Sequence, residues 1–383
     1  MEWKEVRLGD VCNIITGFPF SGKKYSKEGI RVVRGDNVTI GNLRWDTEKD
    51  KRWNEPFDKT EYYSLQANDI VIGMDGSRVG KNKARIKEED LPLLLAQRVA
   101  CVRHNELAEQ DYLYYNIFSK KFIDYVNSIH TGSAIPHISQ KQIEDYKILL
   151  PNLETQRRIA SILSSLDRKI ELNNKINADL EEMAQAIFKN WFVDFEPFKD
   201  GKFVDSELGM IPEGWKVGTL EDLITIKYGK DHKKLEDGTF PVYGSGGLMR
   251  FVNSWLYNGE SVLIPRKGTL DNIMYVCEKF WTVDTMFFSV PKMDYVMKYV
   301  YNYIKRFDFS KMNEGTSVPS NTAARLNKMQ ILIPTHEVLE MYDETLCPIY
   351  NKRKMNDKES RTLSLLRDTL LPRLMSGEIE IPE

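Results

Sequence analysis

The pattern of apolar and polar positions predicts a long helix that begins near Asn152. From there to about Phe195 the chain contains no glycine and no proline, the residues that most often end a helix. Apolar residues recur at intervals of three and four, which is the spacing of one helical face. They are Ile159, Leu163, Leu166, Ile170, Leu180, Ala184, Ile187 and Trp191. Such a long seam is typical of two helices that bury each other, although each could instead pack on its own domain.

A second apolar seam follows the first at an offset of 183 residues. It comprises Tyr342, Leu346, Ile349, Leu363, Leu370 and Leu374. Pro348 lies within this seam and predicts a kink or a late start of the helix. The midpoint of the first helix, taken as 152–195, falls near Asn173, and the same offset leads to Asn356. We therefore expect an antiparallel pair in which Asn173 faces Asn356, with Asn177 close by, because a buried polar layer penalises other registers.

Three further pairs of segments repeat in the same order along the chain. "EWKEVRLGDVCNIITG" resembles "GWKVGTLEDLITIKYG", with Trp3 and Trp215 at an offset of 212. "DIVIGMDGSRVGK" and "ESVLIPRKGTLDN" share a glycine, Gly76 and Gly268, at an offset of 192. "TGSAIPHISQKQIEDYKILLP" (131–151) matches "EGTSVPSNTAARLNKMQILIP" (314–334) at an offset of 183. The falling offset indicates two copies of one domain that differ by loop insertions, each copy followed by a long helix.

Composition fits this picture and excludes some classes of protein. The chain has 383 residues, 42% apolar and 29% charged, with a net charge of −2. These values are ordinary for a globular protein and argue against a tail that coats nucleic acid or membrane by charge alone, while local basic patches stay possible. The amino terminus has no apolar signal core, and no apolar run approaches a membrane span. The four scattered cysteines indicate reduced thiols, so we expect a cytoplasmic protein.

Four segments resemble the specificity subunits of type I restriction–modification systems. They are "QRRIASILSSLDRKIELNNKIN" (156–177), "WFVDFEPF" (191–198), "IPEGW" (211–215) and "LLPRLMSGEIEIP" (370–382). The resemblance implies a subunit that reads double-stranded DNA, needs no cofactor and catalyses nothing itself. It also implies partners: methyltransferase (modification) subunits in two copies, and restriction subunits that translocate and cleave DNA.

The expected architecture follows from the repeat and the resemblance together. It is an α+β fold: two globular mixed α/β target recognition domains are separated by two long antiparallel helices, in a pseudo-two-fold internal repeat. The expected segments are 1–151 for the first domain, 152–196 for the first spacer helix, 197–334 for the junction and second domain, and 335–383 for the second helix and tail.

Short motifs give no sign of catalysis. "GMDGSRVGKNK" (73–83) is one residue too short for a phosphate-binding loop, and Asn82 stands where serine or threonine would reach the metal. The five histidines lack metal-ligand spacing. Two alternatives stay open: a stand-alone DNA-modifying enzyme with a dispersed site, and a coiled-coil scaffold without a DNA role.

The candidate DNA-binding residues lie in the two glycine loops. Glycine lets the backbone approach phosphate closely, lysine and arginine neutralise it, and arginine forms a bidentate pair with guanine. The predicted contacts are Ser77, Arg78, Lys81 and Lys83 in the first loop, and Arg266, Lys267 and Thr269 in the second. Another basic stretch, which includes Arg31 and Arg34, ranks lower because charge runs are usually solvated. No metal site is expected.

Overall fold

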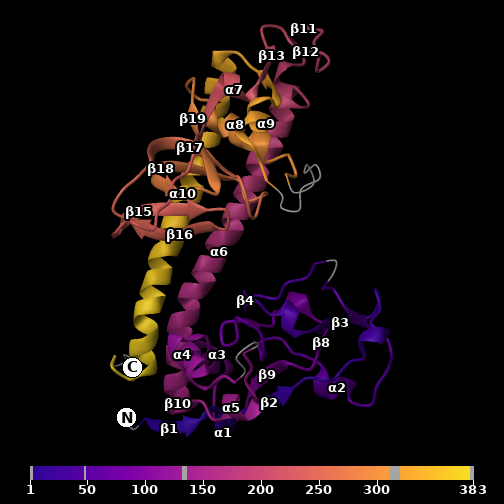
Figure 1. Ribbon diagram of the computed structural model, residues 1–383, viewed down its shortest axis with the longest axis vertical. Helices are drawn as coiled ribbons and strands as arrows, with labels where there is room; N and C mark the ends of the chain where they lie inside the picture. Colours follow the sequence, from indigo (N-terminus) through magenta and orange to yellow (C-terminus); the bar gives the residue numbers. More distant parts are fainter. Residues whose placement is uncertain (1–2, 47–48, 132–135, 310–319, 380–383) are drawn as a thin grey trace. The chain divides into compact units, whose positions relative to one another are not determined.

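The structure of the chain is a computed structural model that describes residues 3–46, 49–131, 136–309 and 320–379. The chain divides into two compact units: Met1–Leu172 with Glu359–Glu383, and Asn173–Lys358. Each unit contains one mixed α/β domain and one half of each of two long helices, α6 (Leu153–Phe192) and α10 (His336–Met375) (Figure 1). The domain boundaries expected from the sequence follow chain order instead, and they stay a prediction.

The first unit is built on a five-stranded sheet, a three-stranded sheet and one strand pair, with orders β2-β9-β6-β7-β4, β5-β3-β8 and β1-β10. Its strands are β1 (Lys4–Arg7), β2 (Cys12–Thr16), β3 (Ile30–Val33), β4 (Ile40–Gly41), β5 (Arg52–Trp53), β6 (Ile70–Gly73), β7 (Lys83–Arg85), β8 (Leu93–Leu95), β9 (Val99–His104) and β10 (Lys147–Leu150). Its short helices are α1 (Leu8–Val11), α2 (Thr60–Tyr63), α3 (Gln110–Phe118), α4 (Lys120–Ile129) and α5 (Gln140–Glu144).

The second unit has a six-stranded sheet, β14-β19-β17-β18-β15-β16, and the strand pairs β13-β20 and β11-β12. Its strands are β11 (Phe203–Val204), β12 (Ile211–Pro212), β13 (Lys216–Thr219), β14 (Ile224–Tyr228), β15 (Asp237–Gly244), β16 (Gly247–Val252), β17 (Tyr257–Pro265), β18 (Met274–Thr282), β19 (Met286–Pro291) and β20 (Gln330–Ile333). Its short helices are α7 (Leu220–Leu223), α8 (Met297–Ile304) and α9 (Ala323–Asn327).

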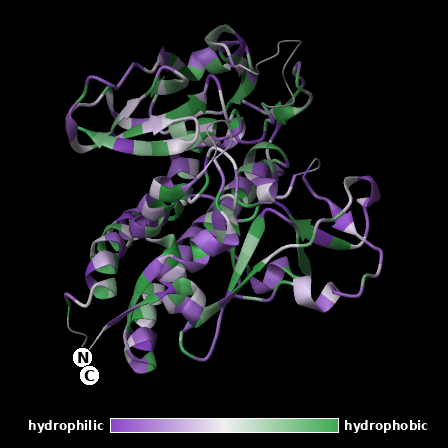
Figure 2. Ribbon diagram, turned by 60° about the horizontal axis from the view of Figure 1, so that its bottom comes forward, coloured by the Kyte–Doolittle hydropathy of each residue, from purple (hydrophilic) through white to green (hydrophobic). Residues whose placement is uncertain are grey.

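Apolar residues of the strands form the core of each domain. In the first, Ile70 and Ile72 of β6 pack with Leu113 of α3 and Phe122 of α4. In the second, Val262 and Ile264 of β17 pack with Val300 and Ile304 of α8. Figure 2 shows this partition, with hydrophobic colouring along many strands and hydrophilic colouring along much of the long helices. Within the described residues, no helix combines the length and apolar character needed to cross a bilayer.

The internal repeat is visible in the strand pairing. Strand β1 pairs antiparallel with β10, with Lys4 opposite Leu150, and β13 pairs antiparallel with β20, with Lys216 opposite Ile333. Lys4 and Lys216 are 212 residues apart, and Leu150 and Ile333 are 183 apart, so the two pairs have the same register. The long helices α6 and α10 begin three residues after these closing strands. The repeated segment therefore closes each domain and leads into its helix.

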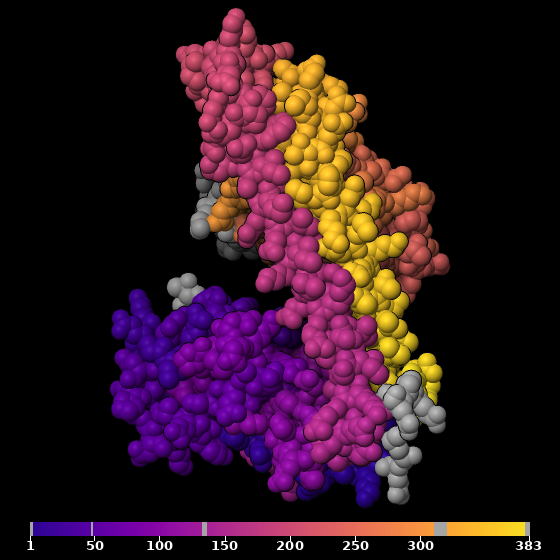
Figure 3. All heavy atoms as spheres, turned by 180° about the vertical axis from the view of Figure 1, so that it is seen from behind, coloured from indigo at the N-terminus to yellow at the C-terminus, as the bar shows by residue number. Residues whose placement is uncertain are grey.

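The helices α6 and α10 contact each other as an antiparallel pair within each unit. In the first unit, Ile159 and Leu163 of α6 pack with Leu374 of α10, and the Asp167 carboxylate lies 2.7 Å from the Arg367 guanidinium. In the second unit, the rings of Phe192 and Tyr342 lie 4.7 Å apart between centroids. Figure 3 shows the second half of α6 beside the first half of α10. The apolar seams predicted from the sequence are thus confirmed.

A polar layer interrupts the apolar seam inside the second unit, as predicted. Asn173 and Asn356 are buried, and Nδ2 of Asn173 lies 3.5 Å from the carbonyl oxygen of Asn356. The Asn356 amide donates a hydrogen bond of 2.8 Å to Oδ1 of Asn177, whose own Nδ2 donates to Asp357 at 2.7 Å. Since buried amides are costly without partners, this network favours one helix register over its neighbours.

One of the two outcomes expected at Pro348, a late start of the helix, does not occur. Helix α10 begins at His336 and continues through Pro348, so it does not start late. Proline removes one backbone hydrogen bond, but apolar packing on both sides of it holds the helix together. Tyr342, Leu346 and Ile349 are all buried against the domain core.

A second correction concerns Lys83, expected in an exposed DNA-binding loop. Its side chain is 3% exposed, because β7 lies between β4 and β6 and directs Lys83 toward α3 and α4. The ammonium nitrogen donates to the Gly80 carbonyl oxygen at 3.0 Å and lies 4.9 Å from the Phe122 ring centroid. Burial lowers the pKa of Lys83 to about 7. Lys83 therefore lies inside the domain, where it is not available for contact with DNA.

The asparagine layer predicts an unusual mutational pattern. Asn173→Leu or Asn356→Leu alone should lower the free energy of unfolding by ~1–3 kcal/mol, because an acceptor in the layer, the Asn356 carbonyl oxygen or Oδ1 of Asn177, loses its donor. The double variant should be about as stable as the wild type or more stable, because two leucines extend the apolar seam. Urea denaturation measures this, with Asn174→Leu on the exposed face as the control. Equal losses that simply add in the double variant would contradict the interpretation.

Lys83 predicts a pH dependence of stability. Its folded-state pKa lies below the ordinary value of 10.5, so the unfolded chain binds more protons between about pH 7 and pH 10.5. Stability contributed by this site therefore rises with pH across that window. Lys83→Met should stabilise the protein most at pH 6, and the gain should shrink by on the order of a few kcal/mol by pH 10. The exposed Lys81→Met is the control, and a gain independent of pH would refute the prediction.

Candidate nucleic-acid interface

The first glycine loop connects β6 to β7 and presents polar side chains at its turn. Gly76 has a φ of +99°, a conformation that favours glycine, and no atom lies within 4 Å of where its Cβ would be. Its N–H donates to the carbonyl oxygen of Pro136 at 3.0 Å. Ser77, Arg78 and Lys81 are exposed on this loop. The loop can thus approach a ligand closely with its backbone and offer it hydroxyl and cationic groups.

The second glycine loop follows β17 in the other unit. Gly268 has a φ of +89°, and Lys267 and Thr269 beside it are exposed. Arg266 is half-buried, with its guanidinium carbon 5.7 Å from the ring centroid of Tyr228. The stacking holds this guanidinium against an aromatic face and leaves its edge for polar contacts.

Both loops are held by equivalent backbone contacts. Asp75 forms a β-bridge with His137, and Lys267 forms one with Ser320. In the first unit, the Met74 N–H donates to the Arg98 carbonyl oxygen at 3.0 Å. In the second, the Arg266 N–H donates to the Thr285 carbonyl oxygen at 2.8 Å. The repeated segments at 131–151 and 314–334 therefore return to the glycine loops, although Gly132, Gly315 and Pro319 lie outside the described residues.

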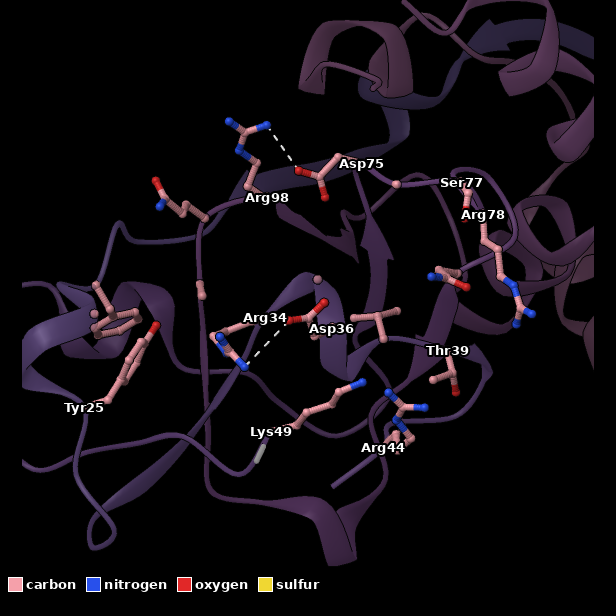
Figure 4. A pocket seen from close by; sticks show the side chains of 18 residues that line it. Tyr25, Arg34, Asp36, Thr39, Arg44, Lys49, Asp75, Ser77, Arg78 and Arg98 are labelled. Carbon is pink, nitrogen blue, oxygen red and sulfur yellow. Dashed lines mark hydrogen bonds and ion pairs between the residues drawn. The ribbon is translucent and has the colours of Figure 1, made fainter. Parts of the chain in front are cut away.

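A cleft of about 730 Å³ opens beside the first loop (Figure 4). Two acidic and five basic side chains line it: Asp36, Asp75, Arg34, Arg44, Lys49, Arg78 and Arg98. Cationic groups outnumber carboxylates in a concave surface, where the field of neighbouring charges is strengthened. The cleft is therefore suited to a polyanion.

The cations of the cleft differ in whether a carboxylate lies close to them. The Arg98 guanidinium donates to the Asp75 carboxylate at 3.1 Å, and the Arg34 guanidinium lies 3.9 Å from Asp36 (Figure 4). The Arg34 guanidinium carbon is also 5.8 Å from the ring centroid of Tyr25. Burial raises the pKa of the Tyr25 phenol, so it stays neutral and can donate a hydrogen bond. Arg78 forms no ion pair with any residue in the described part of the chain.

The structure brings together only some of the residues predicted from the sequence. Ser77 and Arg78 line the cleft, Lys81 is exposed outside its lining, and Lys83 is buried. The sequence interpretation missed Tyr25, Arg44, Lys49 and Arg98, and ranked Arg34 low. Their one sequence signal is the basic stretch that contains Arg34. Among the described residues, no group of three or more His, Cys, Asp and Glu side chains is arranged to hold a metal ion.

Known proteins resemble this chain along most of its length. The family described as "Type I restriction modification DNA specificity domain" matches residues 1–182 and 212–344. The MjaIX specificity subunit of Methanocaldococcus jannaschii is 28% identical over 310 residues, which cover 71% of this chain and 70% of the relative. The HindI specificity subunit of Haemophilus influenzae is 22% identical over 466 aligned positions, which cover 99% of this chain and all of the relative.

A solved structure shares the fold. The crystal structure of the type I restriction–modification S subunit from M. genitalium matches with a TM-score of 0.58 at 17% identity, over 100% of this chain and 97% of that one. The family match covers both copies of the repeat. The chain therefore belongs to the family of type I restriction–modification DNA specificity proteins.

Proposed function

We propose that this chain is the non-catalytic subunit that gives a type I restriction–modification complex its DNA sequence specificity. Each of the two domains reads one half-site of a bipartite, asymmetric target in double-stranded DNA. The observation that carries this proposal is the pair of glycine loops, whose backbone frames match while their side chains differ. Asp75, Ser77 and Arg78 in one loop stand against Lys267, Thr269 and Leu270 in the other.

The charge of the first cleft supports DNA as the ligand. Neutralising phosphates with lysine and arginine supplies most of the affinity of protein–DNA complexes, and contacts to base edges supply sequence preference. Arg44, Lys49 and Arg78 are cations suited to phosphate. In the second domain, Lys267 and Arg266 offer the same chemistry. The proposed interface therefore comprises the loop residues Ser77, Arg78, Lys81, Arg266, Lys267 and Thr269. It also includes the other cations that line the cleft: Arg34, Arg44, Lys49 and Arg98.

In the proposed complex, the helices α6 and α10 set the separation of the half-sites. They also offer surfaces on which two methyltransferase subunits and the restriction subunits assemble. The complex would hold the catalytic groups, and this subunit would use no cofactor. Its four cysteines are free, which suits a reducing cytoplasm.

Two other functions would give different results in simple assays. A stand-alone modifying enzyme would transfer labelled methyl groups from S-adenosylmethionine, or consume ATP with magnesium, as the purified chain alone. A coiled-coil scaffold would retain no duplex at any salt concentration, even with its partner subunits. The proposed function predicts no turnover by the chain alone and salt-dependent retention of duplex by the assembled complex.

The proposal predicts a split and asymmetric methylation motif. Two separate readers that face one side of the duplex should place their half-sites about one helical turn, ~10 bp, apart or slightly more. Because the loops differ in side chains, the half-sites should differ in sequence. Genome-wide methylation profiles of cells with and without the gene measure this. A continuous or palindromic motif would rule out two independent readers.

A further inference from the structure

An ion pair between Arg98 and Asp75 lies in the cleft of the first domain, where β6 ends and β9 begins. These strands are neighbours in the sheet, with Gly73 opposite Val99. Asp75 follows the first strand, and Arg98 directly precedes the second. Their side chains meet at 3.1 Å, with 60% of the Arg98 side chain and 27% of the Asp75 side chain exposed. The pair therefore stands at the ends of two paired strands and lines one edge of the cleft (Figure 4).

The backbone of Arg98 is held in an uncommon conformation. Its φ is +70°, in the left-handed region that costs energy for residues other than glycine. The Met74 N–H bonds to its carbonyl oxygen at 3.0 Å and fixes this geometry from the neighbouring strand. Such conformations persist where surrounding structure enforces them, and they concentrate at functional sites.

Base recognition requires a guanidinium with a fixed orientation, unlike phosphate binding, which needs only charge. Among the described residues, Arg98 is the one arginine of the cleft whose side chain donates a hydrogen bond to another lining residue. That bond uses Nη1 and leaves the edge formed by Nε and Nη2 for a ligand. Two parallel N–H donors on one edge match the O6 and N7 acceptors of guanine in the major groove.

We propose that Arg98 is a specificity-determining residue that reads a guanine in the half-site of the first domain, and that Asp75 is its positioning residue. This inference rests on the proposed function and names the base that this site prefers. Asp75 restricts the guanidinium before DNA binds, so less rotamer freedom is lost on binding.

The second domain has no such pair at the equivalent positions. The matching backbone bonds place Lys267 where Asp75 stands and Thr285 where Arg98 stands. A lysine beside a threonine offers one point charge and a hydroxyl, without the planar fork. The two half-sites should therefore differ at the base pair that Arg98 reads.

The test uses the full chain assembled with its methyltransferase subunits and a set of duplexes. Each duplex carries the motif methylated by the wild-type complex, with one base pair replaced. With Arg98→Ala, discrimination at one G·C pair of one half-site should fall about tenfold or more, while preferences elsewhere hold. Arg98→Lys keeps the charge without the fork and should give the same pattern. Asp75→Asn should weaken discrimination at the same pair.

Two control variants separate base reading from general affinity. Arg78→Ala should slow methylation of every duplex by a similar factor, because phosphate contacts carry no sequence information. Lys267→Ala should leave preferences in the half-site read by Arg98 as they are. The melting temperature of each variant reports folding, and if Arg98→Ala does not assemble, Arg98→Lys and Asp75→Asn decide the question.

A uniform loss across all duplexes with the Arg98 variants would overturn this inference and leave the proposed function standing. Relaxation at a pair other than G·C would overturn it as well. If the wild-type complex methylates without sequence preference, the proposed function itself fails, and that result is visible before any variant is made.

Discussion

The antiparallel contact between α6 and α10 is the constraint on which the proposed function depends. Apolar residues such as Leu163 and Leu374 supply contact energy, but an apolar seam alone tolerates slippage by a heptad. The buried amides of Asn173 and Asn356 remove that tolerance, because each finds its polar neighbours in one register only. A slip of one helical turn would displace one helix against the other by about 5.4 Å and leave these groups buried without partners.

A second constraint acts inside each domain, where one backbone frame carries different side chains. The strand pairs β1-β10 and β13-β20 have the same register, and the glycine loops share their backbone hydrogen bonds. Side chains on such a frame can change without disturbing the fold, because Arg78 and Lys267 are exposed and contribute little to the core. This separation lets one architecture present two chemically distinct reading surfaces.

Local periodicity explains which parts of the structure could be predicted from the sequence. The two long helices follow from the spacing of apolar residues, and the Asn173–Asn356 layer follows from the offset of 183 residues between the two seams. Both patterns can be read directly from the sequence. The burial of Lys83 could not be predicted, because strand β7 lies inside a sheet whose strand order the sequence does not reveal. Arg34, Arg44, Lys49 and Arg98 come from separate segments that the fold brings to one cleft, so no motif marks them. At Pro348 the sequence carries a strong local signal against a helix, but tertiary packing overrides it and α10 continues through this residue.

The most direct test of the account changes the length of the helix pair and measures the target. Seven residues that continue the apolar seam would be inserted into α6 between Arg168 and Asn173, and seven into α10 between Asn356 and Arg367. One heptad adds about 10 Å of helix, which corresponds to ~3 bp of duplex. Methylation profiling should then show both half-sites unchanged and the gap between them longer by about that amount. An unchanged gap, or altered half-sites with the same gap, would contradict the claim that this helix pair sets the spacing of the two readers.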